Sequence, residues 1–548
     1  MFGGRDLNRG IELCAVVEQM YSYQALFRTF GSVEFLDQCE RIAYNALPGT
    51  ITPNMWQHQY LQLANELNAA YGESEHTWNA DGPDSTGMGV EPNFGCCTAN
   101  FNQGWPKLAT NAIFTFDAAA AARAGGKEAA GETGVLASTS TPTGIAVGIF
   151  LPSSATIAIP LPSTTRGDGG VAPSTVEVEV SVVTDYPFGD SVTIKVTVPP
   201  PAPTSSAPSP TTVPLQIRIP GWSTAATLSA SSTADDVGFS PLQTGLRNGT
   251  MATVAGCCKA GATTTVTLAL HPTIEVETGW GAELPSKDWP ADENHTVSEG
   301  YGYFSGAALA GGDLRHANAT WEEATQWCNN EPLCVTFSFA NKVFPKNSSK
   351  HGDPAHKLGR GDVYFKSTFV TNSDPKWSTW LRIDAPGFGQ PTNAAAVVRG
   401  PLVFARRLDQ KVAVVKTWPT FNNTDQNVTL DVAKTGAWNH ALVLDAANPA
   451  KHMSLVTHTA PGPVPFDIQK YPLIIRAKAR QVDGWGAMEG LTSFAAEPPA
   501  SPIDCSKAAH GCAAEDVTVE LVPYGATNLR LSGLPWVLEP SSMHSTTV

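Results

Sequence analysis

Helical spacing of apolar residues is confined to the start of this chain, and this restriction limits its possible folds more than any other feature. Apolar residues recur at helical spacing over 13–30, where Gly31 predicts the helix end, and again over 36–47. Ser32 is expected to cap the second helix, with Glu34 in its first turn. Two helices joined by a tight turn form an αα-hairpin, which must bury its apolar face against other helices. One hairpin is too small to form a domain alone.

Strand patterns dominate the rest of the 548 residues. They alternate with period two or form apolar runs of strand length. The 48 Gly, the 42 Pro and the low charged fraction of 16% suit short strands and turns rather than long helices. Such spacing is typical of one or two antiparallel β-sandwiches. The predicted strands lie at 145–150, 176–180, 192–196, 215–219, 265–268, 396–398, 402–404 and 517–521.

Changes in composition divide the chain into four parts and predict a multidomain α + β protein. Residues 1–112 form a helical domain, and 113–280 form a β-sandwich interrupted by an Ala/Gly-rich run and a Pro-rich tract. In the insert 281–385, the nearby Cys328 and Cys334 predict a small disulfide-pinned module. Part of this insert resembles an apple/PAN-like module; a surface insertion without a ligand is the alternative. Residues 386–548 supply the remaining strands and a C-terminal β domain.

Charge and targeting signals limit the classes of partner and location. A net charge of −15 would repel a phosphate backbone, so no nucleic-acid partner is expected. No apolar run approaches the ~20 residues of a membrane span. The chain begins without a signal peptide, yet it carries glycosylation sequons, so we expect a secreted protein that has lost its N-terminal part. Chance is the alternative explanation for the sequons, which lie at Asn248, Asn294, Asn318, Asn347, Asn422 and Asn427.

The first cysteines of the chain predict metal chemistry. Cys14 follows Glu12 by two residues, and Cys96 and Cys97 are adjacent. Adjacent cysteines do not easily bond each other, because the eight-membered ring strains the peptide, but both can bind a soft metal as thiolates. Three thiolates and a carboxylate complete a tetrahedral zinc shell if Glu12 and Cys14 converge where the chain enters the helix. On spacing alone, buried free thiols or disulfides to distant partners are the alternatives.

Six short sequences in order along the chain resemble glycoside hydrolase family 127, the β-L-arabinofuranosidase-like enzymes. Each is weak evidence alone, but their order is specific, and they span most of the chain outside the insert and the low-complexity tracts. They are ELC at 12–14, CERIAYNALPG at 39–49, QY at 59–60, NFGCC at 93–97, RIPGW at 218–222 and RGPLVF at 399–404.

The resemblance implies the C-terminal part of an (α/α)6 barrel followed by antiparallel β-sandwich domains. It also implies a zinc- and cysteine-dependent retaining glycosidase whose substrate is a carbohydrate, such as an arabinose-containing cell-wall glycan or glycoprotein sugar. Cys96 would attack the anomeric carbon, because a metal-held thiol is already deprotonated at neutral pH. The implied zinc ligands are Glu12, Cys14, Cys96 and Cys97.

Two further positions of the motifs, Glu40 and Tyr60, match residues that line the sugar pocket in the family. Without this match, Glu40 would be interpreted as an exposed helix charge, and Tyr44, one turn later, as a core aromatic residue. His58 and Trp56 lie in the same region, but packing or surface roles are favoured for them over sugar binding, as for His76 and Trp78.

The other cysteines are expected to be structural. Cys505 and Cys512, like the pair in the insert, are close enough to form a local disulfide in an oxidising compartment. The adjacent Cys257 and Cys258 lack a Glu-x-Cys companion, so a second metal site there is not favoured.

The catalytic acid is the main departure from the family pattern. A retaining glycosidase needs a second group to protonate the leaving oxygen. In the family this Glu lies upstream of the Glu-x-Cys motif, whereas only Asp6 among the residues before Glu12 is acidic. We therefore expect the acid and most of the barrel to be missing, so a glycosidase is predicted but the activity of this chain is not; Glu91 is a conceivable donor by proximity alone. A non-catalytic secreted carbohydrate-binding or adhesion protein is the alternative function, and a purely structural zinc protein is a third; the oligomeric state is not predicted.

Overall fold

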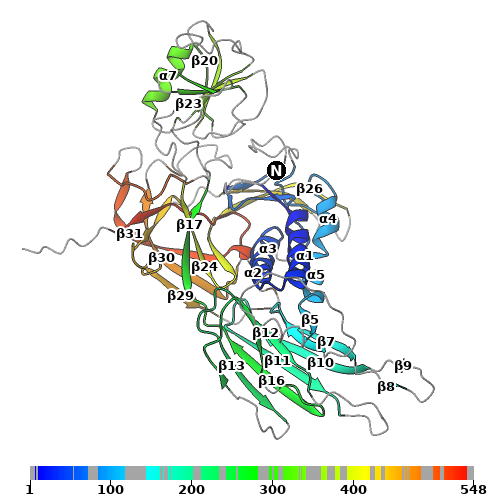
Figure 1. Ribbon diagram of the computed structural model, residues 1–548. Helices are drawn as coiled ribbons and strands as arrows, with labels where there is room; N and C mark the ends of the chain where they lie inside the picture. Colours follow the sequence, from blue (N-terminus) through cyan, green and yellow to red (C-terminus); the bar gives the residue numbers. More distant parts are fainter. Residues whose placement is uncertain are drawn as a thin grey trace, which may run out of the picture.

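The structure is a computed structural model, and it describes most of the helical and strand-forming parts of the chain (Figure 1). The Ala/Gly-rich run, most of the Pro-rich tract, His76 and Trp78 lie outside the described residues. The described residues are 7, 10–52, 55–71, 84–117, 143–160, 164–165, 171–172, 175–200, 212–233, 242–254, 257–281, 295–298, 301–305, 313–331, 334, 336–340, 360–366, 377–382, 392–419, 426–432, 438–458, 462, 464, 466–467, 469–482, 485, 498–506 and 511–539.

The predicted αα-hairpin is present, with one difference at its turn. Helix α1, Leu13–Phe30, ends at Gly31, whose φ of 71° lies in the left-handed region that glycine tolerates. Helix α2, Glu34–Arg41, begins after Val33, and no side chain caps it. The predicted cap at Ser32 is therefore wrong: its backbone carbonyl, not its hydroxyl, accepts a hydrogen bond from the Phe35 N–H at 3.3 Å.

The second apolar stripe continues beyond α2 without a break. It passes into a π-helical turn, η1 (Ile42–Ala46), and then into α3 (Leu47–Gly49). Helices α4 (Cys96–Phe101) and α5 (Gly104–Thr110) complete the segment, and all of these helices share one apolar core. The implied (α/α)6 barrel is not seen among the described residues, whose helices here pack beside sheets rather than closing a ring (Figure 1).

The first sheets follow the predicted strand pattern. A four-stranded sheet has the order β15-β12-β6-β5, and a six-stranded sheet has the order β14-β13-β16-β11-β10-β7. Both contribute to one apolar core, as expected of a sandwich, but β6 pairs with β12 in parallel, so the sandwich is not purely antiparallel. The bounds are β5 Ile113–Asp117, β6 Thr143–Val147, β7 Ser153–Pro160, β10 Thr175–Thr184, β11 Ser191–Val198, β12 Leu215–Ile219, β13 Thr227–Ser232, β14 Leu242–Gln243, β15 Thr250–Thr253 and β16 Ala262–Ala269, with a small β8 (Thr164–Thr165) and β9 (Val171–Ala172) pair.

The later strands form a large sheet that also binds the helical segment. Its main order is β17-β24-β25-β31-β30-β28-β33, and β29 pairs with β30. The short strand β3 from the helical segment joins it by pairing with β32, whereas β4 pairs with β27 in a separate three-stranded sheet of order β26-β27-β4. The bounds are β3 Asn65–Glu66, β4 Asn68–Ala69, β17 Ile274–Trp280, β24 Ala394–Arg399, β25 Leu402–Arg407, β26 Gln410–Thr417, β27 Gln426–Val432, β28 His440–Leu444, β29 Met453–Thr457, β30 Leu473–Val482, β31 Cys512–Pro523, the 3-10 turn η6 Tyr524–Ala526, β32 Arg530–Leu531 and β33 Trp536–Leu538.

The described strands between 295 and 382 form a sheet of their own, in the order β18-β19-β23-β21-β22-β20. Helix α7 (Trp321–Asn330) starts with a capping box between Thr320 and Glu323, and Cys328 at its end is bonded to Cys334. The strands are β18 His295–Ser298, β19 Tyr301–Ser305, β20 Asp313–Ala319, β21 Thr336–Phe339, β22 Gly361–Lys366 and β23 Ser378–Arg382.

The remaining cysteines are paired, and one sequon is buried. Cys505 and Cys512 form the expected disulfide. Cys257 and Cys258 are bonded to each other, although adjacent cysteines are not expected to bond easily, and neither is a free thiol. The sequon residue Asn427 is buried and accepts a hydrogen bond from the Trp418 indole at 2.9 Å, so it is not available to a glycan in this structure. None of the helices among the described residues is long and apolar enough to span a membrane.

Candidate functional site: a Glu/Cys3 cluster

A short strand pairing sets the position of the first two cluster residues. Strand β1 (Ile11–Glu12) pairs with β2 (Leu61–Gln62), so that Glu12 lies opposite Leu61, and the Leu13 N–H donates to the Tyr60 carbonyl at 3.0 Å. Glu12 is the extended N-cap residue of α1, and Cys14 lies in the first helical turn. The change from strand to helix at this point lets two side chains that are two residues apart face the same space.

Helix α4 brings the other two ligand candidates to the same place. It begins at Cys96, so both adjacent cysteines lie in its first turn. The Cys14 and Cys97 sulfur atoms are 3.3 Å apart, and those of Cys96 and Cys97 are 4.0 Å apart. The Glu12 Oε1 atom lies 3.7 Å from the Cys96 sulfur and 3.8 Å from the Cys97 sulfur. The structure therefore unites Glu12, Cys14, Cys96 and Cys97 in a group, here called the Glu/Cys3 cluster, whose ligand atoms all lie within 4.8 Å of one another.

The donor set of the Glu/Cys3 cluster fits a tetrahedral metal ion. A tetrahedral zinc shell with Zn–S bonds near ~2.3 Å has sulfur–sulfur edges of about 3.8 Å. The observed separations of 3.3–4.0 Å between neighbouring ligand atoms bracket this edge. Thiolates favour soft or borderline ions such as zinc over calcium or magnesium. The cluster can therefore hold a metal ion.

Burial disfavours the ionisation of two thiols of the cluster, Cys14 and Cys97. Burial raises the pKa of Cys14, while the amide of Asn100 acts in the opposite direction. Burial also raises the pKa of Cys97, which is fully buried, and the neighbouring Cys14 adds to this effect. Because metal binding requires deprotonated ligands, an ion here would release protons and its affinity would rise with pH.

The buried Tyr60 contacts the partly exposed Cys96 of the cluster. The Tyr60 hydroxyl lies 3.8 Å from the Cys96 sulfur. Burial and then Cys96 raise the pKa of this phenol, which therefore stays protonated and can act as a donor. Of the two residues predicted to line the sugar pocket, the structure brings Tyr60 to the cluster.

Glu40 lies elsewhere, in a fully buried ion-pair network. It forms an ion pair with Arg218 of β12, and it accepts hydrogen bonds from the Phe150 N–H at 2.8 Å and from the Tyr186 hydroxyl. Asp37 of α2 binds the same arginine. Burial opposes the charge on Arg218, but Glu40 and Asp37 outweigh it and raise the guanidinium pKa. The structure thus shows Glu40 bonded to protein groups, and neither inside the Glu/Cys3 cluster nor on an exposed helix face.

The other candidate residues of this segment have packing or surface positions. Tyr44 is buried and donates to the Phe150 carbonyl, as expected of a core aromatic residue. His58 is buried, with its Nε2 atom 3.0 Å from the Thr98 hydroxyl, and Trp56 is exposed. The Glu91 carboxylate lies beside Gly95, the residue before α4.

One contact of the cluster is absent from the sequence interpretation. The Asn100 side-chain N–H donates to the Cys14 sulfur at 3.1 Å. Its position four residues after Cys96, on one helix face, is the available sequence signal, but the pairing with Cys14 requires α1 and α4 to pack together.

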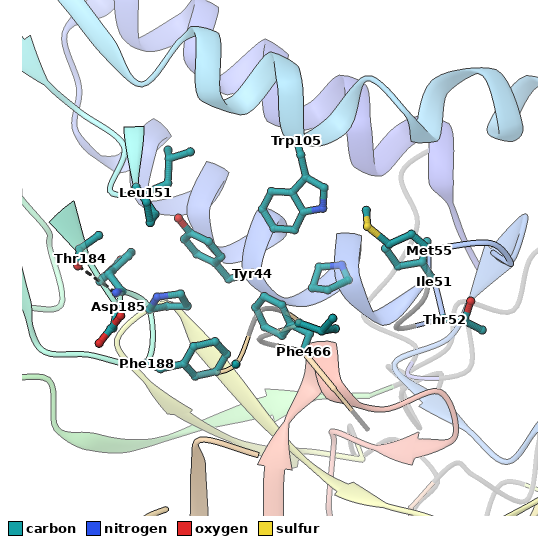
Figure 2. A pocket seen from close by; sticks show the side chains of 16 residues that line it. Tyr44, Ile51, Thr52, Met55, Trp105, Leu151, Thr184, Asp185, Phe188 and Phe466 are labelled. Carbon is teal, nitrogen blue, oxygen red and sulfur yellow. Dashed lines mark hydrogen bonds between the residues drawn. The ribbon is translucent and has the colours of Figure 1, made fainter. Parts of the chain in front are cut away.

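A separate apolar cavity of about 500 Å³ lies between η1, α5 and the turn 184–188 (Figure 2). Aromatic and proline residues make up half of its lining, and it shares no residue with the Glu/Cys3 cluster. Its aromatic lining residues are Tyr44, Trp105, Tyr186, Phe188 and Phe466.

The helical segment that carries the cluster matches one known protein family. Residues 4–110 match the family described as "Beta-L-arabinofuranosidase, GH127 catalytic domain". The matched segment carries all four residues of the Glu/Cys3 cluster. This match confirms the resemblance to glycoside hydrolase family 127 that the motifs predicted.

Several solved structures are similar to nearly the whole chain at low identity. A structure titled a glycoside hydrolase is 13% identical with a TM-score of 0.42, and the match covers 97% of this chain and 53% of that one. A GH127 β-L-arabinofuranosidase from Geobacillus stearothermophilus T6 has 13% identity, a TM-score of 0.42, and coverage of 97% and 51%. A GH127 β-arabinofuranosidase has 12% identity, a TM-score of 0.41, and coverage of 98% and 51%. The chain thus spans about half the length of these structures, and no curated protein sequence matches it.

Proposed function

We propose that this chain carries the nucleophile and metal site of a zinc- and cysteine-dependent retaining glycosidase that acts on β-linked L-arabinofuranose or a related sugar. The observation that supports this proposal best is the union of Glu12 and three cysteines within the segment that matches the family's catalytic domain. The carbohydrate class follows from the family, and the arabinose preference and the zinc identity are part of the proposal.

In the proposed reaction, Cys96 is the nucleophile. Its sulfur is the one that contacts the Tyr60 hydroxyl, and its side chain is partly exposed, whereas Cys97 is fully buried. When bound by Glu12 and the thiolates, zinc supplies the positive charge that keeps the sulfur atoms deprotonated at neutral pH. Tyr60 can direct a donor at the sulfur or at a sugar hydroxyl placed above it.

The chemistry proceeds in two displacements. The Cys96 sulfur forms a bond to the anomeric carbon while the bond to the leaving oxygen breaks, and a carboxylic acid protonates that oxygen. Water, deprotonated by the same carboxylate, then attacks the anomeric carbon and releases Cys96 as a thiolate, with net retention. We assign none of the described residues to the acid.

Substitution of Cys96 tests the function. In the full-length, zinc-loaded protein, Cys96→Ser should reduce hydrolysis of an aryl β-L-arabinofuranoside by at least about 10³-fold, because an alcohol is not ionised at neutral pH. Cys39→Ala is the matched control: its thiol is also free, but it is buried in α2 and donates to the Met20 carbonyl, so activity should persist.

A zinc-loaded full-length protein without hydrolysis would contradict the enzyme proposal. Retained sugar binding in that protein would favour the non-catalytic carbohydrate-binding alternative. Zinc binding with neither activity nor sugar binding would indicate a structural site.

We also propose that the protein is secreted. The local disulfides Cys328–Cys334 and Cys505–Cys512 support an oxidising compartment. Mass spectrometry of the protein from its source should find both bridges and glycans at exposed sequons such as Asn248, but not at the buried Asn427. Reduced cysteines throughout the native protein would contradict this location.

A further inference from the structure

The three sulfur atoms of the Glu/Cys3 cluster have different surroundings. The Cys14 sulfur receives the Asn100 amide N–H at 3.1 Å and lies 3.3 Å from the Cys97 sulfur. Cys97 is fully buried. Cys96 is partly exposed, and its contacts are Tyr60, Glu12 and Cys97, at 3.7–4.0 Å. Among the described contacts of these three sulfur atoms, only the one at Cys14 is a short hydrogen bond from a side-chain N–H.

The orientation of the Asn100 amide is set by a second contact. The Gln103 side-chain N–H donates to the Asn100 Oδ1 atom at 3.3 Å and to the Ala99 carbonyl at 3.4 Å. Because the amide oxygen accepts from Gln103, the amide nitrogen is directed at Cys14. Asn100 lies one turn after Cys96, so its side chain points back toward the start of α4, where the cysteine pair lies.

An N–H donor directed at a sulfur atom favours its thiolate over its thiol. The donor also orients that sulfur and accepts part of its negative charge, as outer-shell groups do for metal ligands. Cys14 and Cys96 are both partly exposed, but Cys96 has no comparable amide contact among the described residues.

We propose that Asn100 is a positioning residue that fixes the Cys14 sulfur as a permanent ligand of the metal and so leaves Cys96 as the sulfur that reacts. This assignment rests on the proposed function, because it presumes that the Glu/Cys3 cluster binds zinc. It divides the three sulfurs into a held ligand, Cys14, a buried ligand, Cys97, and a reactive ligand, Cys96. Gln103 supports the division by orienting the amide.

Zinc affinity of the full chain, measured by competition with a chromophoric chelator, tests the assignment. Asn100→Ala should weaken zinc binding by about 10–100-fold, the usual cost of losing an outer-shell partner. Gln103→Ala keeps the Asn100 amide but removes the hydrogen bond that orients it, so a smaller loss of zinc affinity, below about 10-fold, is expected. Asn102→Ala is the matched control, since Asn102 is an exposed residue at the end of the same helix. The zinc affinity of this variant should equal that of the unmodified chain.

Alkylation of the zinc-loaded chain by iodoacetamide, mapped by peptide mass, gives a readout that a loss of folding would not imitate. The unmodified chain should be labelled at Cys96 first, whereas Asn100→Ala should be labelled at Cys14 as well. Unchanged affinity together with unchanged labelling in Asn100→Ala would overturn the assignment while leaving the proposed function intact. Failure of the unmodified chain to bind zinc would instead overturn the proposed function.

Discussion

Two clusters of ionisable side chains lie on the same helical segment and differ in how they satisfy their charges. The Glu/Cys3 cluster places a carboxylate and three thiols together, and the described residues around it supply no cation. The Arg218 cluster, by contrast, joins Glu40 and Asp37 to a fully buried guanidinium, and the backbone N–H groups of Phe150 and Gly221 also donate to these two carboxylates.

This difference shows how to separate a binding site from a structural one. Charge that the protein neutralises internally has no capacity left for a ligand, and it joins elements together: here α2 and β12. A donor set without an internal cation is suited to an external one. Glu40 and Glu12 both lie in family motifs, but only Glu12 belongs to a donor set without an internal cation.

The largest loss of stability is expected from removing the cation of the Arg218 cluster. Arg218→Met leaves Glu40 and Asp37 without their cation in the interior, and this should lower the free energy of unfolding by about 3–5 kcal/mol. The measurement is urea denaturation monitored by tryptophan fluorescence.

Arg41→Met is the control for this comparison. Arg41 pairs with Glu277 at 2.8 Å, but both side chains are about one-third exposed, at 31% and 34%. Solvent screening reduces such a pair to about 0.2–1 kcal/mol. Equal losses in the two variants would show that burial does not distinguish the pairs.

A second buried pair gives the pH dependence. Glu66 of β3 is ion-paired with Arg530 at 3.0 Å, and burial raises the pKa of Glu66 to about 7. Because the folded pKa lies above the unfolded value of about 4.5, this group stabilises the fold below pH ~4.5, and that contribution is lost as the pH rises to about 7. A shift of this size corresponds to roughly 3 kcal/mol.

Glu66→Gln removes this titration and keeps an acceptor for Arg530. The difference in free energy of unfolding, variant minus unmodified chain, should increase by on the order of 3 kcal/mol as the pH rises from 4 to 8. Denaturation curves at several pH values check this difference. A stability difference that does not vary with pH would contradict the raised pKa.

The Glu/Cys3 cluster should change the stability of the protein when a metal ion binds, because it has no internal cation to lose. Saturating zinc at 100 times its dissociation constant should raise the free energy of unfolding by about 2.7 kcal/mol, and a chelator should reverse this gain. Thermal unfolding with and without chelator measures it. Cys14→Ser should lose most of the chelator effect, whereas Arg41→Met should retain it. A chelator effect of equal size in Cys14→Ser would show that the metal does not bind at the Glu/Cys3 cluster.

Local patterns predicted the elements well where one physical rule dominates. The 13–30 stripe and Gly31 predicted the first helix to its last residue, and the run 215–219 predicted β12 with its bounds. Ser32 failed as a cap because the turn uses its backbone carbonyl. The pairing of β3 with β32 was beyond prediction, since it joins residues more than 460 positions apart.

The sequence by itself determined which groups can do chemistry: a Glu-x-Cys and a Cys-Cys pair, with thiols and a carboxylate suited to a soft metal. Only the tertiary structure decided which of these groups meet. The packing of α1 on α4 unites the four ligands and adds Asn100, whereas the packing of α2 on β12 binds Glu40 to Arg218. The physical reason is that a residue type sets the available donors and charges, while burial and neighbours decide whether those donors and charges are already satisfied.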